Sequence, residues 1–278
     1  MNLNQRKNIE SYQLFSNVMG DKSNPLLFLI HGSPISSHGF RAYMEQLCEK
    51  YYVVAPDLLT FGKSHGPENG CDFLDLSKSL ASFLKDHVSN GSEVSLALHD
   101  WGGPICLGAL ALLNEQGLKV GISKLLFINT GIDPKFRPHW WWPFQYRFFS
   151  RLAVVELNSF SWGLPVLMHS AFKNRETKRV YQSFLKNRST RKTAMRLENL
   201  DMYDETMTKV SKNYKSFYPK RVHIFWGIPE PYFSNRDIEY IAEIFSHATF
   251  EKVPNAGHFP MEDDPIALMT TMRKFFLS

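Results

Sequence analysis

The stretch VSLALHDWGGPICLG (94–108) decides the fold of this chain. Its opening residues are mostly apolar, as is typical of a strand that is buried on both faces of a sheet. Asp100 follows this strand, and two glycines at 102 and 103 then open an apolar stretch that predicts a helix. A buried strand that turns directly into a helix is the repeating unit of a parallel sheet covered by helices. The sequence therefore predicts an α/β fold with Asp100 at the turn between strand and helix.

The same alternation continues on both sides of this unit. Further buried strands are expected at 25–32, 51–57, 124–130, 221–227 and 249–254, with an antiparallel edge strand at 11–18. Helices are expected at 38–50, 73–89, 103–117, 234–245 and 261–276. Strands and helices that alternate in this way are joined by right-handed crossovers. We therefore expect a doubly wound, mostly parallel sheet.

Residues 133–218 interrupt this rhythm. They are rich in aromatic and basic residues, and two stretches, 139–152 and 171–185, predict helices with apolar faces. We interpret 133–218 as an inserted helical cap and assign 1–132 together with 219–278 to the core. The stretch 133–220 holds 17 basic and seven acidic residues, although the whole chain has a net charge of only +5. We read this excess as a solvated helical surface, since the basic residues form no nucleic-acid-binding motif.

Composition narrows the class of protein. Of the 278 residues, 44% are hydrophobic and 21% charged, as in an ordinary globular domain. No apolar run approaches the ~18 residues of a membrane span, so membrane insertion is not expected. The polar beginning MNLNQRKNIE predicts no secretory signal and hence a cytoplasmic location. The three cysteines are scattered and nucleotide-binding glycine loops are absent, so we expect neither a metal site nor a cofactor.

Four strand ends carry polar or glycine-rich motifs, and such ends meet at one edge of an open α/β sheet. These motifs are HGSP (31–34), HDWGG (99–103), GIPEP (227–231) and NAGHFP (255–260). In HDWGG, Asp100 occupies the position of the exposed residue in a nucleophile elbow. A carboxylate at that position can form a covalent ester with an electrophilic carbon. A simple helix cap is the competing interpretation of Asp100.

His258 and a carboxylate complete a possible triad. His258 follows Asp100 in the chain order of nucleophile, acid and histidine that this kind of fold uses. A histidine can activate water near neutral pH, provided that a partner carboxylate holds its tautomer. Glu230, after the 221–227 strand, fits that role, and Asp133 is the rival acid. Asn129 ends the 124–130 strand but cannot serve as a charged acid.

The chain resembles the α/β-hydrolase superfamily and, within it, the haloalkane dehalogenase-like branch. The resemblance rests on five segments: HGSPISSHGFR (31–41), APDLLTFGKS (55–64), HDWGGPICLG (99–108), WGIPEP (226–231) and NAGHFPMEDDP (255–265). These segments span the core, whereas 133–218 resembles nothing closely. The combination is specific for the fold and for an aspartate nucleophile, and less specific for the substrate.

The resemblance implies a role for each matching residue. Asp100 would attack carbon, His258 would activate the water that cleaves the resulting ester, and Glu230 would orient His258. The backbone N–H groups of Ser33 and Trp101 would form an oxyanion hole, and the Trp101 indole N–H is a suitable donor to a halide ion. The expected partners are a small apolar substrate and water. A small haloalkane is therefore the first substrate class to consider.

Two departures keep other substrates open. Ser33 stands where the branch usually has a halide-binding asparagine. Its hydroxyl can donate but is shorter than an asparagine amide, and a cap tryptophan is the other candidate donor (Trp140, Trp141, Trp142, Trp162). Epoxide hydrolases share the nucleophile but usually have a small residue where this chain has Leu98, and they need two cap tyrosines. The candidate tyrosines are Tyr146, Tyr181, Tyr203, Tyr214 and Tyr218. A β-lactone decarboxylase and, from another class, a non-catalytic receptor remain alternatives.

Overall fold

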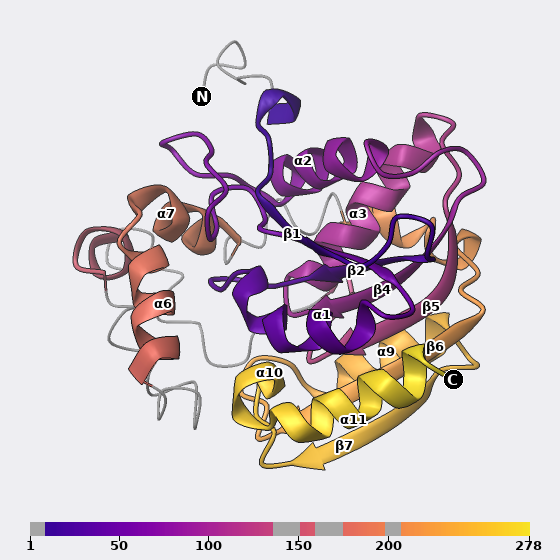
Figure 1. The fold of residues 1–278 in the computed structure, drawn as a ribbon. Coiled ribbons are helices and arrows are strands. Elements are labelled where there is room, and N and C mark those ends of the chain that lie inside the picture. Colours follow the sequence, from indigo (N-terminus) through magenta and orange to yellow (C-terminus); the bar gives the residue numbers. More distant parts are fainter. Residues whose placement is uncertain (1–8, 136–150, 159–174, 198–206) are drawn as a thin grey trace.

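The sheet forms the centre of the molecule. The computed structural model describes residues 9–135, 151–158, 175–197 and 207–278 (Figure 1). In this part of the chain, seven strands form one sheet in the order β1-β3-β2-β4-β5-β6-β7. They are β1 Ser16–Met19, β2 Leu26–Ile30, β3 Tyr52–Pro56, β4 Glu93–His99, β5 Gly121–Ile128, β6 Arg221–Ile228 and β7 Thr249–Pro254. Strand β1 pairs antiparallel with β3, and the other pairings are parallel, which confirms the predicted sheet.

Helices cover both faces of the sheet, as Figure 1 shows. The described core helices are α1 Arg41–Leu47, α2 Phe73–Lys85, α3 Gly102–Glu115, α9 Asn235–Ile244, α10 Pro260–Asp263 and α11 Pro265–Phe276. Successive side chains of a strand point to opposite faces. Thus Phe28 and Ile30 pack with α2, α3 and α9, whereas Leu27 and Leu29 pack with α1 and α11. The apolar runs of the central strands, such as β2, are continuous because each of these strands contributes to two hydrophobic cores.

The edge strand expected at 11–18 is shorter in the structure, at Ser16–Met19, and two further elements differ from the sequence-based expectation. Strand β7 was expected to be buried, but it is the edge of the sheet, and Phe250 within it is 60% exposed. The helix expected over 261–276 is instead two helices, α10 and α11, separated at Asp264. Proline disfavours helical backbone in the residue before it, and Pro265 follows Asp264, whose side chain caps the new helix at the Ala267 N–H.

The described parts of 133–218 include two helices that lie beside the sheet (Figure 1). They are α6 Arg175–Leu185, within the helix expected at 171–185, and α7 Arg188–Leu197. The other helix expected there, at 139–152, lies almost wholly outside the described residues. Helix α7 is tied to the loop after β3 by hydroxyl contacts: Thr193 Oγ1 bonds Thr60 Oγ1 at 2.7 Å and accepts the Cys71 N–H at 2.8 Å. The cap boundaries 133–218 stay a prediction.

Within the described ranges, no helix has both the length and the apolar character needed to cross a bilayer.

Candidate active site

Asp100 stands at a sharp turn between β4 and α3. Its backbone adopts a positive φ of 50°, a left-handed conformation that non-glycine residues seldom take. The turn is fastened on both sides, because the Asp100 N–H donates to Asn129 O at 3.2 Å and Thr130 Oγ1 donates to Asp100 O. The Asp100 side chain is 7% exposed. The neighbouring strand β5 thus holds the strained backbone in place and fixes the direction of the carboxylate.

The nearby glycines leave room for this turn. A Cβ atom on Gly32 would lie 2.2 Å from Asp100 Oδ1, inside the carboxylate. A Cβ atom on Gly102 would lie 2.6 Å from the carbonyl oxygens of Ile30 and His31. The first glycine lets the loop after β2 approach the carboxylate, and the second lets the start of α3 pack against β2. Both close approaches require residues without side chains.

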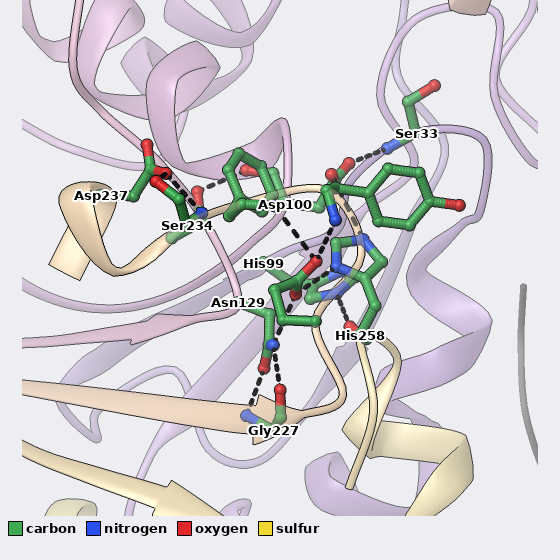
Figure 2. Close-up of polar contacts among 12 residues, drawn as sticks. Ser33, His99, Asp100, Asn129, Gly227, Ser234, Asp237 and His258 are labelled. Atoms are coloured by element: carbon green, nitrogen blue, oxygen red, sulfur yellow. Dashed lines mark hydrogen bonds and ion pairs between the residues drawn. The ribbon is translucent and has the colours of Figure 1, made fainter. Parts of the chain in front are cut away.

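His258 lies between two carboxylates, as Figure 2 shows for Asp100 and His258. Its Nδ1 is 2.7 Å from Glu230 Oε2, and its Nε2 is 3.4 Å from Asp100 Oδ2. The side chains of His258 and Glu230 are 1% and 2% exposed. Because Glu230 accepts from Nδ1, Nε2 is the ring nitrogen that faces Asp100. The structure therefore brings together the three residues that the sequence nominated.

Glu230 is held by donors other than His258. Asn129 Nδ2 donates to Glu230 Oε2 at 2.7 Å, and the Tyr232 N–H donates to Oε1 at 2.7 Å. Asn129 is fixed in turn, since its amide makes two 2.9 Å hydrogen bonds to the backbone N–H and C=O of Gly227 (Figure 2). These hydrogen bonds fix the Glu230 carboxylate beside His258.

The charges around His258 raise its pKa. Burial alone would lower the pKa, because it disfavours the imidazolium ion. The negative charge of Glu230, hydrogen bonds to both carboxylates and the charge of Asp100 oppose burial and raise the pKa of His258 to about 10. At neutral pH, His258 is therefore an imidazolium between two carboxylates. Such a histidine can return to a neutral base only when one of the two charges is removed.

Ser33 approaches Asp100 through its backbone. The Ser33 N–H donates to Asp100 Oδ1 at 2.7 Å, so one carboxylate oxygen is occupied by a backbone donor while Oδ2 faces His258. Figure 2 shows the Ser33 hydroxyl pointing away from Asp100. Trp101 directly follows Asp100; it is 7% exposed, and its ring centroid lies 6.5 Å from that of Phe73. The roles expected for Trp101, a backbone N–H in the oxyanion hole and an indole N–H that donates to a halide, stay predictions.

Asp133, the rival acid, is engaged elsewhere. It accepts the Lys135 N–H at 2.8 Å and lies 3.5 Å from the Arg236 guanidinium. His258 Nδ1 instead contacts Glu230, which makes Glu230 the carboxylate placed to orient it.

The cap aromatics nominated from the sequence are only partly described. Tyr181 donates to Glu262, Tyr214 donates to Ile132 O, and Tyr218 is 79% exposed. The hydroxyls of Tyr181 and Tyr214 thus donate to groups other than Asp100. Tyr146, Tyr203 and the four cap tryptophans lie outside the described residues.

Sequence reasoning missed three residues of this site. Asn129 was dismissed because it cannot be an acid, although its amide holds the acid. Thr130 and His99 were not singled out, although Thr130 fastens the Asp100 turn and His99 Nε2 lies 2.8 Å from His258 O. Their positions in the sequence could have indicated them: His99 ends the strand that precedes Asp100, and Asn129 and Thr130 follow the neighbouring strand β5.

Comparisons with known proteins identify the fold family of this chain. A family model described as alpha/beta hydrolase fold matches residues 25–265. A cis-3-alkyl-4-alkyloxetan-2-one decarboxylase of Xanthomonas campestris pv. campestris is 23% identical over 92% of this chain and 89% of its own length. Haloalkane dehalogenase 2 of Mycobacterium tuberculosis is 24% identical over 87% of this chain and 85% of its own length. The crystal structure of a putative ancestral haloalkane dehalogenase superposes with a TM-score of 0.77 at 18% identity, covering 96% of both chains.

Proposed function

The chain belongs to the α/β hydrolase fold family, and we propose that it is an enzyme that forms an alkyl ester on Asp100 and then hydrolyses it. The observation that carries this proposal is the position of the Asp100 carboxylate. One oxygen accepts the Ser33 N–H, and the other faces the His258–Glu230 pair. A helix cap needs neither of these contacts, whereas a nucleophile followed by a water-activating base uses both.

In the first step, Asp100 Oδ2 attacks the substrate carbon. A new C–O bond forms as the bond to the leaving group breaks, and the leaving group departs with the bonding electron pair. Oδ1 becomes the ester carbonyl oxygen and keeps its hydrogen bond from the Ser33 N–H. The indole of Trp101, next to the nucleophile, is the nearest sequence candidate for a donor to the departing anion.

In the second step, water attacks Cγ of the Asp100 ester. Formation of the ester removes the negative charge of Asp100, so the pKa of His258 falls and the ring can release its proton and act as a base. Nε2 then takes a proton from the attacking water. The tetrahedral oxyanion forms at Oδ1, where the Ser33 N–H is already in position. Collapse of this intermediate leaves a carboxylic acid at Asp100, and the departing alkoxide receives the proton from His258. The acid then gives its own proton to His258, which restores the resting carboxylate and imidazolium.

A small haloalkane is the first substrate class that we propose. Trp101 supports it, since an indole N–H suits a large, weakly basic halide, and so does the similarity to haloalkane dehalogenase 2 over 87% of the chain. The substrate of this reaction is uncharged, so a small apolar molecule and water are the partners that the mechanism needs.

A β-lactone is the second candidate, and the orientation of Ser33 favours it. The Ser33 hydroxyl, which would have to replace the usual asparagine as second halide donor, points away from Asp100 in Figure 2. A lactone ring releases no halide and needs no such donor. The Xanthomonas relative, whose name states that it decarboxylates oxetan-2-ones, is similar over 92% of the chain.

The test is a single turnover in ¹⁸O-labelled water. If Asp100 forms the ester, the product alcohol carries unlabelled oxygen, and mass spectrometry finds one ¹⁸O in the peptide that contains Asp100. Label in the alcohol and none in the peptide would mean that water attacks the substrate directly, which would overturn the mechanism. A panel of bromoalkanes, oxetan-2-ones and epoxides, assayed for halide, carbon dioxide and diol, assigns the substrate class. Ligand-dependent thermal stabilisation without any turnover would instead indicate a receptor.

A further inference from the structure

His99 is a buried histidine of the site that the proposed chemistry does not use. It is the last residue of β4, directly before Asp100, and it is fully buried. Its Nε2 lies 2.8 Å from the carbonyl oxygen of His258, a residue 159 positions further along the chain. Its ring also contacts the His258 ring, with the two centroids 5.1 Å apart, as Figure 2 illustrates. One side chain therefore links the nucleophile strand to the loop that carries the base.

The tautomer of His99 follows from its partners. A carbonyl oxygen only accepts hydrogen bonds, so Nε2 must carry the proton. In the described part of the chain, Nδ1 is buried and has no hydrogen-bond partner. Buried polar atoms are nearly always satisfied, so a histidine with one orphaned nitrogen calls for an explanation. An apolar side chain would fill the same space without that cost, but it could not donate to His258.

His99 is also suited to stay neutral. Burial, together with the nearby charge of His258, lowers the pKa of His99 to about 3. A neutral ring can lie against an imidazolium without repelling it and keeps one fixed donor over the whole working range of pH. The contact therefore acts as a permanent link that does not change when His258 gains or loses its proton.

The loop that carries His258 needs such a link. Asn255 and Gly257 both have positive φ angles, of 64° and 58°, so the chain turns sharply just before His258. The backbone of this loop, rather than a regular element, sets the position of the imidazole. Ser33, His258 and Asp100 must keep their spacing to within a fraction of an ångström for water attack, because small displacements of a catalytic group are costly in rate.

We propose that His99 is a positioning residue, which fixes the His258 loop to the nucleophile strand through its hydrogen bond to the His258 carbonyl. The role deepens the proposed function and rests on it, since it assigns His99 to the ester-cleaving step in which His258 acts. Ester formation, in contrast, does not use the base His258. Loss of the hydrogen bond from His99 should therefore slow ester cleavage and leave the rate of ester formation nearly unchanged.

The test compares two polar substitutions. In His99→Gln the amide nitrogen stands as far along the side chain as Nε2, whereas in His99→Asn it stands only as far as Nδ1. In single-turnover experiments we expect His99→Asn to slow ester cleavage by about 10- to 100-fold and to leave ester formation nearly unchanged. His99→Gln should restore most of the lost rate. The control is His247→Asn, which removes a comparable 3.0 Å bond from His247 Nε2 to Pro219 O before β6 and should change neither step.

A second measurement needs no substrate. Nitrogen NMR of ¹⁵N-histidine-labelled protein should show His99 as the neutral Nε2–H tautomer. The His258 Nδ1 proton should exchange with water slowly in the wild type and His99→Gln, and faster in His99→Asn. Equal exchange in all three proteins, or a His99 proton on Nδ1, would overturn the proposal. If no substrate forms an ester, the proposed function fails, and the NMR result still decides whether His99 fixes the loop.

Discussion

The strand ends that carry the candidate triad and the helices α6 and α7 are held to the molecule in different ways. At the strand ends, buried charges and backbone groups form a closed network, with Glu230 bound by His258, Asn129 and the Tyr232 N–H. Helices α6 and α7 are fastened mainly by hydroxyls, such as Tyr181 to Glu262 and Thr193 to Thr60. Loss of one hydroxyl contact costs about 1 kcal/mol of stability, whereas a buried charge that loses its partner costs about 3–5 kcal/mol. The difference suggests that the strand ends fix the reaction, while the helical segment can change without disturbing it.

The largest effect on activity at the strand ends is expected for Asp100→Asn. Without the carboxylate there is no nucleophile, so turnover should fall by at least about 10⁴-fold. The measurement is product release from whichever substrate of the panel is active. Asp133→Asn is the matched control and should retain activity, because Asp133 contacts Lys135 and Arg236 rather than His258. Residual activity in Asp100→Asn at the wild-type level would remove Asp100 from the reaction.

The next largest effect is expected for His258→Phe. Ester formation does not need the base, but ester cleavage does, so the reaction should stop after one step. Intact-protein mass spectrometry should then find the protein heavier by the alkyl group, bound at Asp100. A protein that neither turns over nor gains mass would contradict the assignment of separate steps to Asp100 and His258.

A smaller loss of activity is expected for Glu230→Gln, together with a change in pH dependence. Removal of its charge lowers the pKa of His258 from about 10 and weakens the hold on its tautomer, so ester cleavage should slow by about 10²- to 10⁴-fold. Between pH 6.5, the ordinary pKa of histidine, and about pH 10, His258 carries a proton in the folded wild type but not in the unfolded chain. The stability that this proton supplies is present below pH 6.5 and is lost as the pH rises to about 10.

Thermal unfolding between pH 6.5 and 10 checks this prediction. The melting temperature should decline more steeply in the wild type than in Glu230→Gln. The control is Glu251→Gln, which removes the charge from a half-exposed pair with His223 outside the site and should leave the decline intact. Identical declines in the wild type and Glu230→Gln would show that Glu230 does not hold the His258 proton.

The smallest effect is expected for Tyr181→Phe, which tests the other side of the comparison. The substitution removes one hydrogen bond to Glu262, which keeps its contact with Arg41, so the free energy of unfolding should fall by about 1 kcal/mol. KM should change more than kcat, because α6 holds no group of the triad. Urea unfolding and steady-state kinetics measure both, with Tyr218→Phe, at an exposed hydroxyl, as control. A loss of kcat as large as that of Glu230→Gln would mean that the helices also fix the reaction.

The sequence predicted the parts of the site that depend on local pattern. The elbow at Asp100 follows from a strand, two glycines and a helix in succession, and all three are observed. The choice between Glu230 and Asp133 was weaker, because both follow strand ends and only the distance to His258 separates them. The break at Asp264 could have been read from the proline after it. The exposure of β7 could also have been read from Glu251 and Lys252 within it, because a central strand such as β2 is wholly apolar.

The sequence alone determined the fold class, the position of Asp100 at the strand-to-helix turn and the chain order of the candidate triad, because these depend on periodicity and turn chemistry among neighbouring residues. Only the tertiary structure decided which strands lie side by side. That order sets Asn129 of the β5 end against Glu230 after β6 and brings His99 to the carbonyl of His258. Such contacts join residues 101 and 159 positions apart, and their geometry depends on strand register and loop backbone, which no local pattern encodes.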